Sequence, residues 1–198
     1  VSAYAITVTN PQKKENSSQY ATYTAYKIFS LVKGNEEDPD KTYDYTLDST
    51  SCAYDLLVKD YNKEDGLSLP NGVTLTPTTG TDNNGKLIYN ASVTFDNATT
   101  FANWLQTNKD NNWVGIVSSI DEDQKNGDTA TIDVGNNQGY YLILNDGANA
   151  VPNLTTVDDQ ITIRDKSTAP SIEKTVDDSS VEVGQTVTYT IKGQVPRS

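Results

Sequence analysis

Alternating apolar and polar positions run through most of the chain and predict a protein built mainly of β-strands. The clearest case is the segment from Leu87 to Phe95, where every second residue faces the same side of an extended chain. Comparable patterns predict strands over residues 4–8, 20–32, 43–47, 114–120, 129–134 and 157–164. Residues 139–144 are almost continuously apolar, which indicates a buried strand.

Two short helices are predicted between these strands. Four apolar residues recur at helical spacing within residues 49–61, namely Ala53, Leu56, Leu57 and Tyr61. Asp48 or Ser49 could cap this helix. Phe101, Trp104 and Leu105 predict the second helix, with Asp96 or Thr99 as its cap.

Residues 62–86 are rich in Gly, Pro, Asn, Asp and Thr, which favours irregular structure with one strand near residues 72–75. The excess of strands over helices predicts a mainly β fold, a sandwich with short helical insertions.

A change of pattern near Pro170 predicts a domain boundary. One set of strands ends near Arg164, and a new alternation begins at Ile172 and continues to Ile191. We therefore expect a first domain over residues 1–168 and the start of a second over residues 169–198. Two strands are too few to close a core, so we expect the sequence to be part of a longer protein.

The chain has 198 residues, with 15 Lys and Arg against 27 Asp and Glu, and its net charge is −12. This charge would repel phosphate groups, so nucleic acid and anionic lipid are unfavourable partners. No run of apolar residues has the length that a membrane helix needs. The single cysteine, Cys52, excludes an internal disulfide and is expected to be a small buried residue.

The residue types present exclude several kinds of catalytic site. The chain has no histidine and one cysteine, which rules out Ser-His-Asp and Cys-His pairs and the common zinc sites. It also has no phosphate-binding Gly-x-x-x-x-Gly-Lys loop. We therefore expect no cofactor, no metal and no enzyme. A surface glycoside hydrolase is a weaker alternative, and it would need two carboxylates converging in a cleft about 5 to 10 Å apart.

Four motifs stand in a defined order along the chain. They are Tyr23-Thr-Ala-Tyr-Lys-Ile-Phe29, Gly139-Tyr-Tyr-Leu-Ile143, Pro170-Ser-Ile-Glu-Lys-Thr-Val176 and Val183-Gly-Gln-Thr-Val-Thr-Tyr-Thr-Ile191. In this order they resemble the backbone pilins of sortase-assembled pili on Gram-positive bacteria.

The resemblance implies an immunoglobulin-like (CNA-B-like) β-sandwich followed by the first strands of a second such domain. It implies a structural subunit that a class C sortase joins head to tail, through a lysine isopeptide bond, into a covalent pilus that supports adhesion. The expected partners are other pilin subunits, the sortase, and host surface or matrix ligands. The expected location is extracellular, on a pilus anchored to the cell wall.

Lys166 stands where this family carries its sortase linkage lysine. The local sequence Arg164-Asp-Lys-Ser167 lacks the Pro and the aromatic residue of the usual Tyr-Pro-Lys-Asn motif, so the assignment rests on position. An ordinary solvated linker lysine is the alternative. An exposed lysine is protonated at neutral pH, so the sortase would have to remove the proton before the amine attacks.

The resemblance also implies candidates for intramolecular isopeptide bonds, which the family forms between Lys and Asn. Lys174 would open the second domain, and its partner Asn would lie beyond residue 198. Lys27 is a second candidate, within the first domain. Strand alternation places its side chain opposite Tyr26 and Ile28, on the solvent side.

A second function remains open on the sequence alone, that of a minor or tip pilin, or a wall-anchored adhesin, which binds host glycan or protein. The side chains of Trp104, Trp113 and the many tyrosines could stack on sugars. Aromatic residues at helical spacing are nevertheless more often part of a core.

Overall fold

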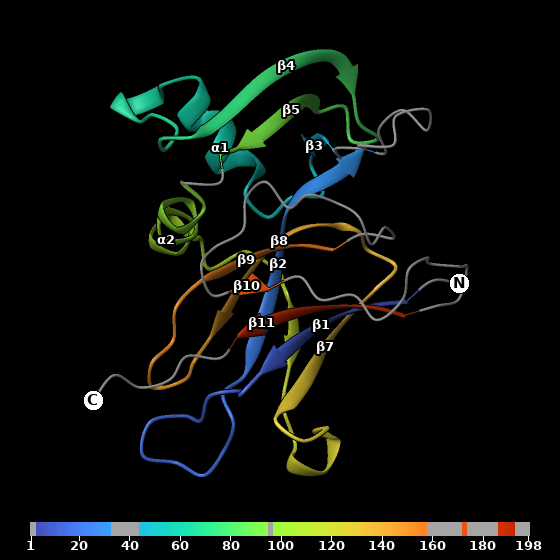
Figure 1. Ribbon diagram of the computed structural model, residues 1–198. Coiled ribbons are helices and arrows are strands. Elements are labelled where there is room, and N and C mark those ends of the chain that lie inside the picture. Colours follow the sequence, from blue (N-terminus) through green and yellow to red (C-terminus); the bar gives the residue numbers. More distant parts are fainter. Residues whose placement is uncertain (1–2, 33–43, 95–96, 158–171, 174–185, 193–198) are drawn as a thin grey trace.

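The computed structural model describes residues 3–32, 44–94, 97–157, 172–173 and 186–192 (Figure 1). The strands are β1 Ala3–Thr9, β2 Tyr23–Val32, β3 Asp44–Leu47, β4 Val73–Thr81, β5 Leu87–Val93, β6 Ile116–Ser118, β7 Thr129–Gly135, β8 Gly139–Asn145, β9 Asn153–Val157, β10 Ile172–Glu173 and β11 Thr186–Lys192. The helices are α1 Tyr54–Tyr61 and α2 Ala98–Asn108, with short 3-10 turns at Glu64–Gly66 and Glu122–Gln124. With 42% of its residues in strands, the protein is mainly β, as predicted.

The strands form two sheets. The larger follows the order β4-β5-β3-β2-β8-β9, with β6 pairing along β2 as well, and all of its pairs are antiparallel. The smaller follows the order β10-β11-β1-β7, and its β1–β11 pair is parallel. In Figure 1, β1, β7 and β11 lie below β8 and β9, while α1, β4 and β5 lie above.

The central strand β8 is buried on both faces. Tyr140 and Leu142 point into one hydrophobic cluster, and Tyr141 and Ile143 point into another. Successive side chains of a strand alternate between faces, so a strand that separates two cores buries side chains on both faces and favours apolar residues at successive positions. This double burial explains the continuous apolar run in the sequence.

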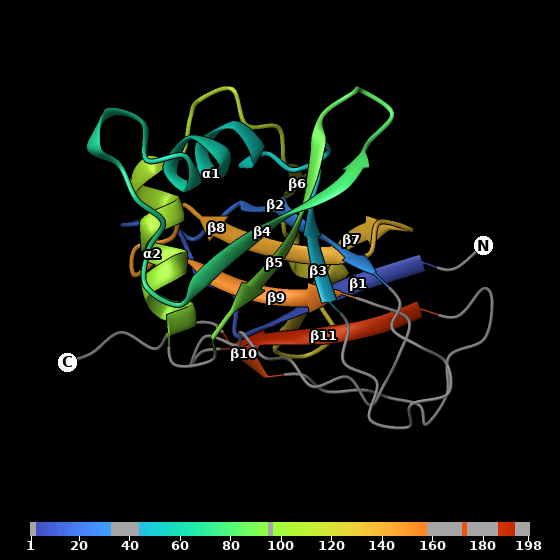
Figure 2. The ribbon, with the colours of Figure 1, turned by 90° about the horizontal axis from the view of Figure 1, so that it is seen from above.

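The first core lies between the larger sheet and the two helices. Phe29 of β2 is fully buried here, with its ring 5.6 Å from Tyr140 and 6.0 Å from Phe101 of α2. Leu57 of α1 and Leu105 of α2 are also fully buried in this core. Figure 2 shows α1 and α2 near each other at one end of the strands.

The second core lies between the two sheets. Ile6 and Val8 of β1 and Ile132 of β7 pack there with Tyr23 of β2 and Val157 of β9. The described residues therefore form two layers of sheet, with the helices covering the outer face of the larger one.

The starts of both helices differ from the prediction. Helix α1 begins at Tyr54, and its N-cap position is Ala53, which makes no side-chain capping hydrogen bond. Asp48 and Ser49 therefore do not cap it, since their side chains bind elsewhere, as described below. Thr99 lies inside α2, whose N-cap position is Asn97, and Asp96 lies outside the described residues.

Two strands were underestimated from the sequence. Strand β4 continues to Thr81 because its polar second half pairs with β5 at the edge of the sheet, where polar side chains can face water. Strand β9 was not predicted, because its Asn and Thr residues break the apolar pattern although every residue of the strand is buried. The predicted strand end near Arg164 lies outside the described residues.

The expected boundary between residues 168 and 169 also lies outside the described residues. Strands from before and after this boundary nevertheless belong to the same sheet, the smaller one. Strand β11, within the range expected for the second domain, pairs along the whole of β1, from Ala3↔Thr186 to Thr9↔Lys192.

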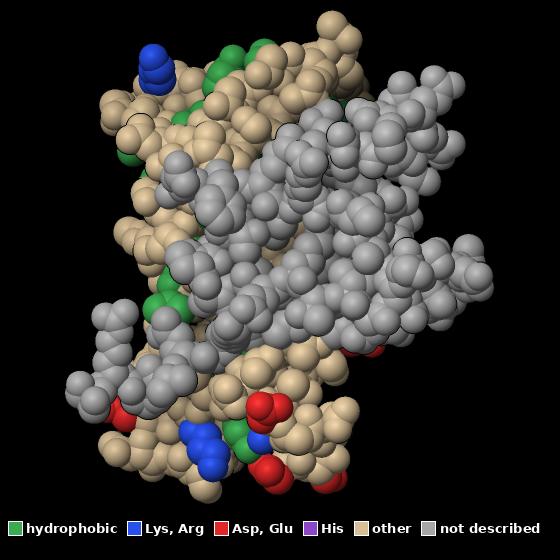
Figure 3. All heavy atoms as spheres, in the orientation of Figure 1, with side chains coloured by type: hydrophobic (Ala, Val, Ile, Leu, Met, Phe, Trp, Pro, Cys, Tyr) green, Lys and Arg blue, Asp and Glu red, His purple; other side chains and the backbone are tan. Residues whose placement is uncertain are grey.

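Charged side chains gather mainly at one end of the face seen in Figure 3, where loops follow β1 and precede β7. Lys14 and Asp146 form an ion pair there at 3.7 Å, and Lys125 lies 3.9 Å from Glu122. The Nζ atom of Lys125 also donates a 2.7 Å hydrogen bond to Tyr20 Oη, which joins the two loops.

Candidate functional site

The structure describes one of the three lysines that the sequence singled out. Lys166 and Lys174 lie outside the described residues, so their roles stay predictions. Lys27 lies on β2, where it pairs with Tyr141 of β8. The surroundings of Lys27 are therefore the starting point for the site.

A β-bulge follows Lys27 on β2. The ladder between β2 and β8 shifts after Lys27, so that Phe29 pairs with Tyr140. The Lys27 side chain is half-buried. Its stem runs along Gly139, where an added Cβ would lie 3.4 Å from Lys27 Cε. Its Nζ atom donates a 2.9 Å hydrogen bond to Thr50 Oγ1.

Asp48 anchors the turn that carries Thr50. Its Oδ2 atom accepts a 2.7 Å hydrogen bond from Ser30 Oγ, and its Oδ1 atom accepts bonds from the backbone N–H of Thr50, at 2.8 Å, and from the Thr50 hydroxyl. Burial alone would raise the pKa of the Asp48 carboxyl. The hydrogen bonds from Thr50 and Ser30, with the positive charge of Lys27, hold that pKa below its ordinary value.

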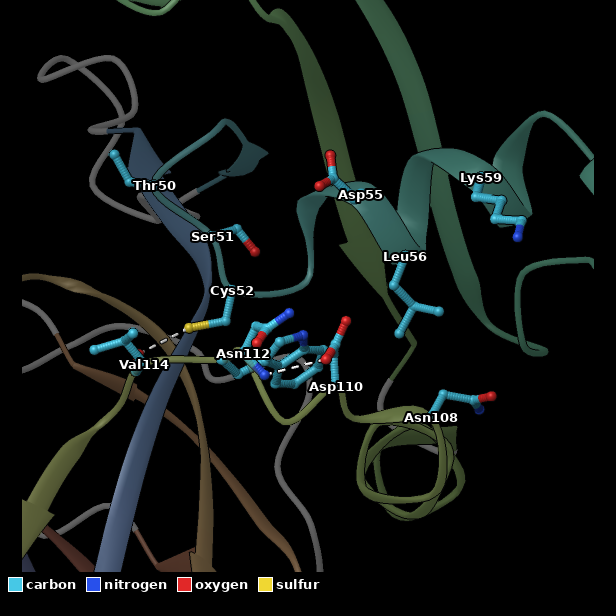
Figure 4. A pocket seen from close by; sticks show the side chains of 11 residues that line it. Thr50, Ser51, Cys52, Asp55, Leu56, Lys59, Asn108, Asp110, Asn112 and Val114 are labelled. Carbon is cyan, nitrogen blue, oxygen red and sulfur yellow. Dashed lines mark hydrogen bonds between the residues drawn. The ribbon is translucent and has the colours of Figure 1, made fainter.

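Two surface hollows meet at the start of α1. The larger, with a volume of about 570 Å³, is lined by Thr50, Ser51, Cys52, Asp55, Leu56, Lys59, Asn108, Asp110, Asn112, Trp113 and Val114 (Figure 4). The smaller, of about 340 Å³, is lined by Ser49, Ser51, Cys52, Tyr54, Asp55, Asn84 and Lys86. They share Ser51, Cys52 and Asp55 and therefore adjoin each other; together they are called here the α1 groove.

The loop between β4 and β5 is fixed against one end of the α1 groove. Asp82 Oδ2 accepts a 2.8 Å hydrogen bond from the backbone N–H of Ser49, and Asn84 Nδ2 donates one of 2.9 Å to Ser49 Oγ. The hydrogen bonds from Ser49, together with those from Lys86 and Asn84, lower the pKa of Asp82 to about 2. The loop is therefore held in place by an ionised carboxylate.

Cys52 holds the segment before β6 against the start of α1. Its Sγ atom donates a 3.1 Å hydrogen bond to the carbonyl oxygen of Val114, and its backbone N–H donates one of 3.0 Å to the carbonyl oxygen of Lys27. Burial raises the pKa of the thiol, so it is a poor nucleophile at neutral pH. The sequence predicted a small buried residue, and the Cys52 side chain is partly buried.

The other wall of the α1 groove is the loop between α2 and β6. The backbone N–H of Asn112 donates a 3.1 Å hydrogen bond to Asp110 Oδ1, and that of Trp113 donates one of 3.2 Å to the carbonyl oxygen of Asp110. The Trp113 ring meets the Tyr26 ring edge-on, at 6.0 Å between centroids. An added Cβ at Gly115 would lie 2.8 Å from Tyr26, so this loop lies close against β2.

The chemistry that the α1 groove offers is that of hydrogen bonding. It contains hydroxyls, amides, two carboxylates, the ammonium groups of Lys59 and Lys86, and an indole ring. Within the described residues, no group of three or more His, Cys, Asp or Glu side chains could hold a metal ion. Burial raises the pKa of the Asp60 carboxyl, but Asp60 does not line the groove and therefore cannot serve there as a proton donor.

Sequence reasoning identified Lys27, Cys52 and Trp113 but did not bring them together. The groove depends on contacts between residues 48–59, 82–86 and 108–114, which are distant in the chain. The run Asp110-Asn-Asn-Trp113 was one available signal, since binding residues are frequent on loops.

Comparison of the chain with protein-family models, with curated proteins and with solved structures gave no match. In the described part of the chain, no helix is both long and apolar enough to span a membrane.

Proposed function

We propose that the chain is the N-terminal part of a structural subunit of a sortase-assembled pilus, exported from the cell and anchored to its wall. In this proposal the first domain is an immunoglobulin-like sandwich of the CNA-B-like type, and residues 169–198 begin a second. The subunit is not an enzyme, and its partners are other subunits, a class C sortase, and ligands on the host surface or matrix.

One observation carries most of the support. Two of the motifs on which the resemblance rests, Tyr23–Phe29 and Gly139–Ile143, are distant in sequence yet pair with each other at the centre of the larger sheet. Tyr26 pairs with Leu142, and Lys27 pairs with Tyr141. Motifs inherited with a shared fold are expected to meet in this way, whereas chance matches are not.

Lys166 is the proposed linkage residue. The sortase thiolate first attacks the Thr–Gly peptide carbonyl of a Leu-Pro-x-Thr-Gly signal; a C–S bond forms, the Thr–Gly C–N bond breaks, and the glycine amine leaves with a proton. The ε-amine of Lys166 then attacks the thioester carbonyl, a C–N bond forms, the C–S bond breaks, and the amine proton passes to the departing thiolate. The pilin contributes an accessible amine, and the enzyme contributes activation. Lys174 is proposed to form an intramolecular isopeptide bond with an Asn of the second domain.

An acceptor assay tests the linkage on the chain itself. The chain is incubated with a class C sortase and a synthetic peptide that carries Leu-Pro-x-Thr-Gly, and its intact mass is measured. We expect one peptide to be added to the native chain and none to Lys166→Ala or Lys166→Arg. Lys109→Ala, which removes a lysine of the described surface, should leave the reaction unchanged. Addition to Lys166→Ala at the native rate would exclude Lys166 as the acceptor.

A further inference from the structure

The α1 groove has the shape of a site for an extended ligand. Its two hollows, of about 570 and 340 Å³, fall within the size range of small-ligand sites and adjoin at Ser51, Cys52 and Asp55. A ligand longer than either hollow could therefore lie across the start of α1.

The larger hollow combines an apolar patch with convergent polar groups. Leu56 points into it from α1 (Figure 4), and Trp113, half-buried against Tyr26, also lines it. Asn112 and Asp110 extend toward α1 from the loop on the far side. A flat apolar surface beside amide and carboxylate groups suits the faces of a sugar ring, which present C–H groups above and below and hydroxyls around the edge.

Charge narrows the class of ligand. The only lysine of the larger hollow, Lys59, lies 3.2 Å from Asp65 in an ion pair. Across both hollows Lys59 and Lys86 balance Asp55 and Asp110, so the α1 groove has no excess of positive charge, within a chain whose net charge is −12. Phosphorylated, sulfated and sialylated ligands would find no net electrostatic attraction there, whereas a neutral ligand needs none. A lipid tail would leave the polar groups of the hollow without hydrogen-bond partners.

The walls are fixed before any ligand arrives. Trp113 is packed against Tyr26, Cys52 holds Val114, and Asp82 holds Ser49. A site whose walls are already ordered loses little conformational entropy on binding. Val114 lines the rim and is 84% exposed, so its side chain offers apolar surface that a ligand could cover.

We propose that the α1 groove binds a neutral oligosaccharide, with the sugar ring against Trp113 and Leu56 and its hydroxyls bonded to Asn112, Asp110 and Asp55. This inference goes beyond the proposed pilus function and does not depend on it. A subunit with such a site would contribute to adhesion directly.

A glycan array tests the proposal. The chain carries one biotin on a C-terminal tag and is displayed on streptavidin, because several copies together reveal weak binding. The array holds neutral, sialylated and sulfated glycans. We expect binding to a group of neutral glycans, and we expect Asn112→Ala and Asp110→Asn to reduce the signal about tenfold or more, the effect of losing roughly one good hydrogen bond to the ligand.

Asn111→Ala is the matched control, because Asn111 is the exposed neighbour of Asn112 and does not line the groove. It should bind as the native chain does. The proposal is overturned if the native chain binds no glycan above background, if it binds only acidic glycans, or if Asn112→Ala and Asn111→Ala bind equally well. A native-like unfolding curve for each variant separates loss of the site from loss of the fold.

Discussion

The ammonium group of Lys27 lies 2.9 Å from the hydroxyl oxygen of Thr50, and that hydroxyl in turn donates to Asp48. This chain of contacts ties the central strand β2 to the turn before α1. It also gives the Lys27 amine, a candidate for an intramolecular isopeptide bond, a hydroxyl as its hydrogen-bond partner. We expect the Lys27 amine to remain free, so the intact mass of the chain should not show the loss of ammonia that an Asn side chain would release on bonding to this amine.

Removing the Lys27 amine should weaken the fold by a modest amount. Lys27→Met keeps most of the stem along Gly139 but deletes the hydrogen bond to Thr50. The free energy of unfolding should fall by about 0.5–1.5 kcal/mol, the usual contribution of such a bond. Urea unfolding at neutral pH measures it. Lys86→Met, at an exposed lysine, is the control, and equal losses in both variants would contradict a specific role for the bond.

The Asp82 carboxylate should make the chain more stable at neutral pH than in acid. Its pKa is about 2 in the folded chain and about 3.9 when unfolded, so the unfolded chain binds more protons between these values. Its contribution is complete above about pH 4 and is lost as the pH falls toward 2. Asp82→Asn should therefore show a smaller drop in urea midpoint across that range than the native chain.

Glu64→Gln is the comparison for Asp82→Asn, since Glu64 is an exposed carboxylate in the short turn after α1. Glu64→Gln should show the same drop in urea midpoint between neutral pH and pH 2 as the native chain. Identical acid profiles for Asp82→Asn and the native chain would show that the Ser49 contact does not depend on the charge.

Asp60 should behave in the opposite way. It is 3% exposed, and its Oδ1 atom is buried without a hydrogen-bond partner in the described structure. Burial raises its pKa, against the opposing effect of Lys59. A carboxyl with a raised pKa in the fold costs stability once it ionises, so the penalty appears as the pH rises above the unfolded value and is absent in acid.

Asp60→Asn should raise the free energy of unfolding at neutral pH by roughly 1 kcal/mol, because the buried negative charge is removed. The gain should disappear as the pH falls below about 4, where the native carboxyl is itself protonated. Asp55→Asn, an exposed position on the same helix, should have little effect. Destabilisation by Asp60→Asn at neutral pH would mean that the carboxylate has a stabilising partner.

Gly139 should tolerate no side chain. A Cβ there would lie 2.7 Å from the carbonyl oxygen of Phe29, a backbone atom that cannot move aside cheaply. Gly139→Ala should lower the free energy of unfolding by about 2 kcal/mol or more, as overpacking does. Gly80→Ala is the control, because the nearest atom to its Cβ would be 3.6 Å away. Similar melting temperatures for both variants would contradict this geometry.

The sequence predicted elements best where one periodicity acted alone. Leu87–Val93 alternates strictly and is strand β5, because one of its faces is buried and the other is exposed. It predicted elements poorly where tertiary contacts overrode local preference. Asp48 is a good capping residue, but its carboxylate is taken up by Ser30 and Thr50, so α1 begins later.

Burial of polar residues was the other source of error. Thr156 of β9 has 0% exposure because its hydroxyl forms a 2.7 Å hydrogen bond with Tyr45 Oη, 111 residues away in the chain. No local pattern reveals such a partner. The α1 groove escaped prediction for the same reason, because its walls come from three separate segments and its shape depends on how they pack.

The most direct test of the pilin proposal is to locate the new bond made by the sortase. The chain that has received the Leu-Pro-x-Thr peptide is digested, and tandem mass spectrometry identifies the lysine that carries the branch. The proposal predicts a branched peptide at Lys166, with Lys27 and Lys174 free of the label. A branch spread over several surface lysines, or placed at another single lysine, would contradict it.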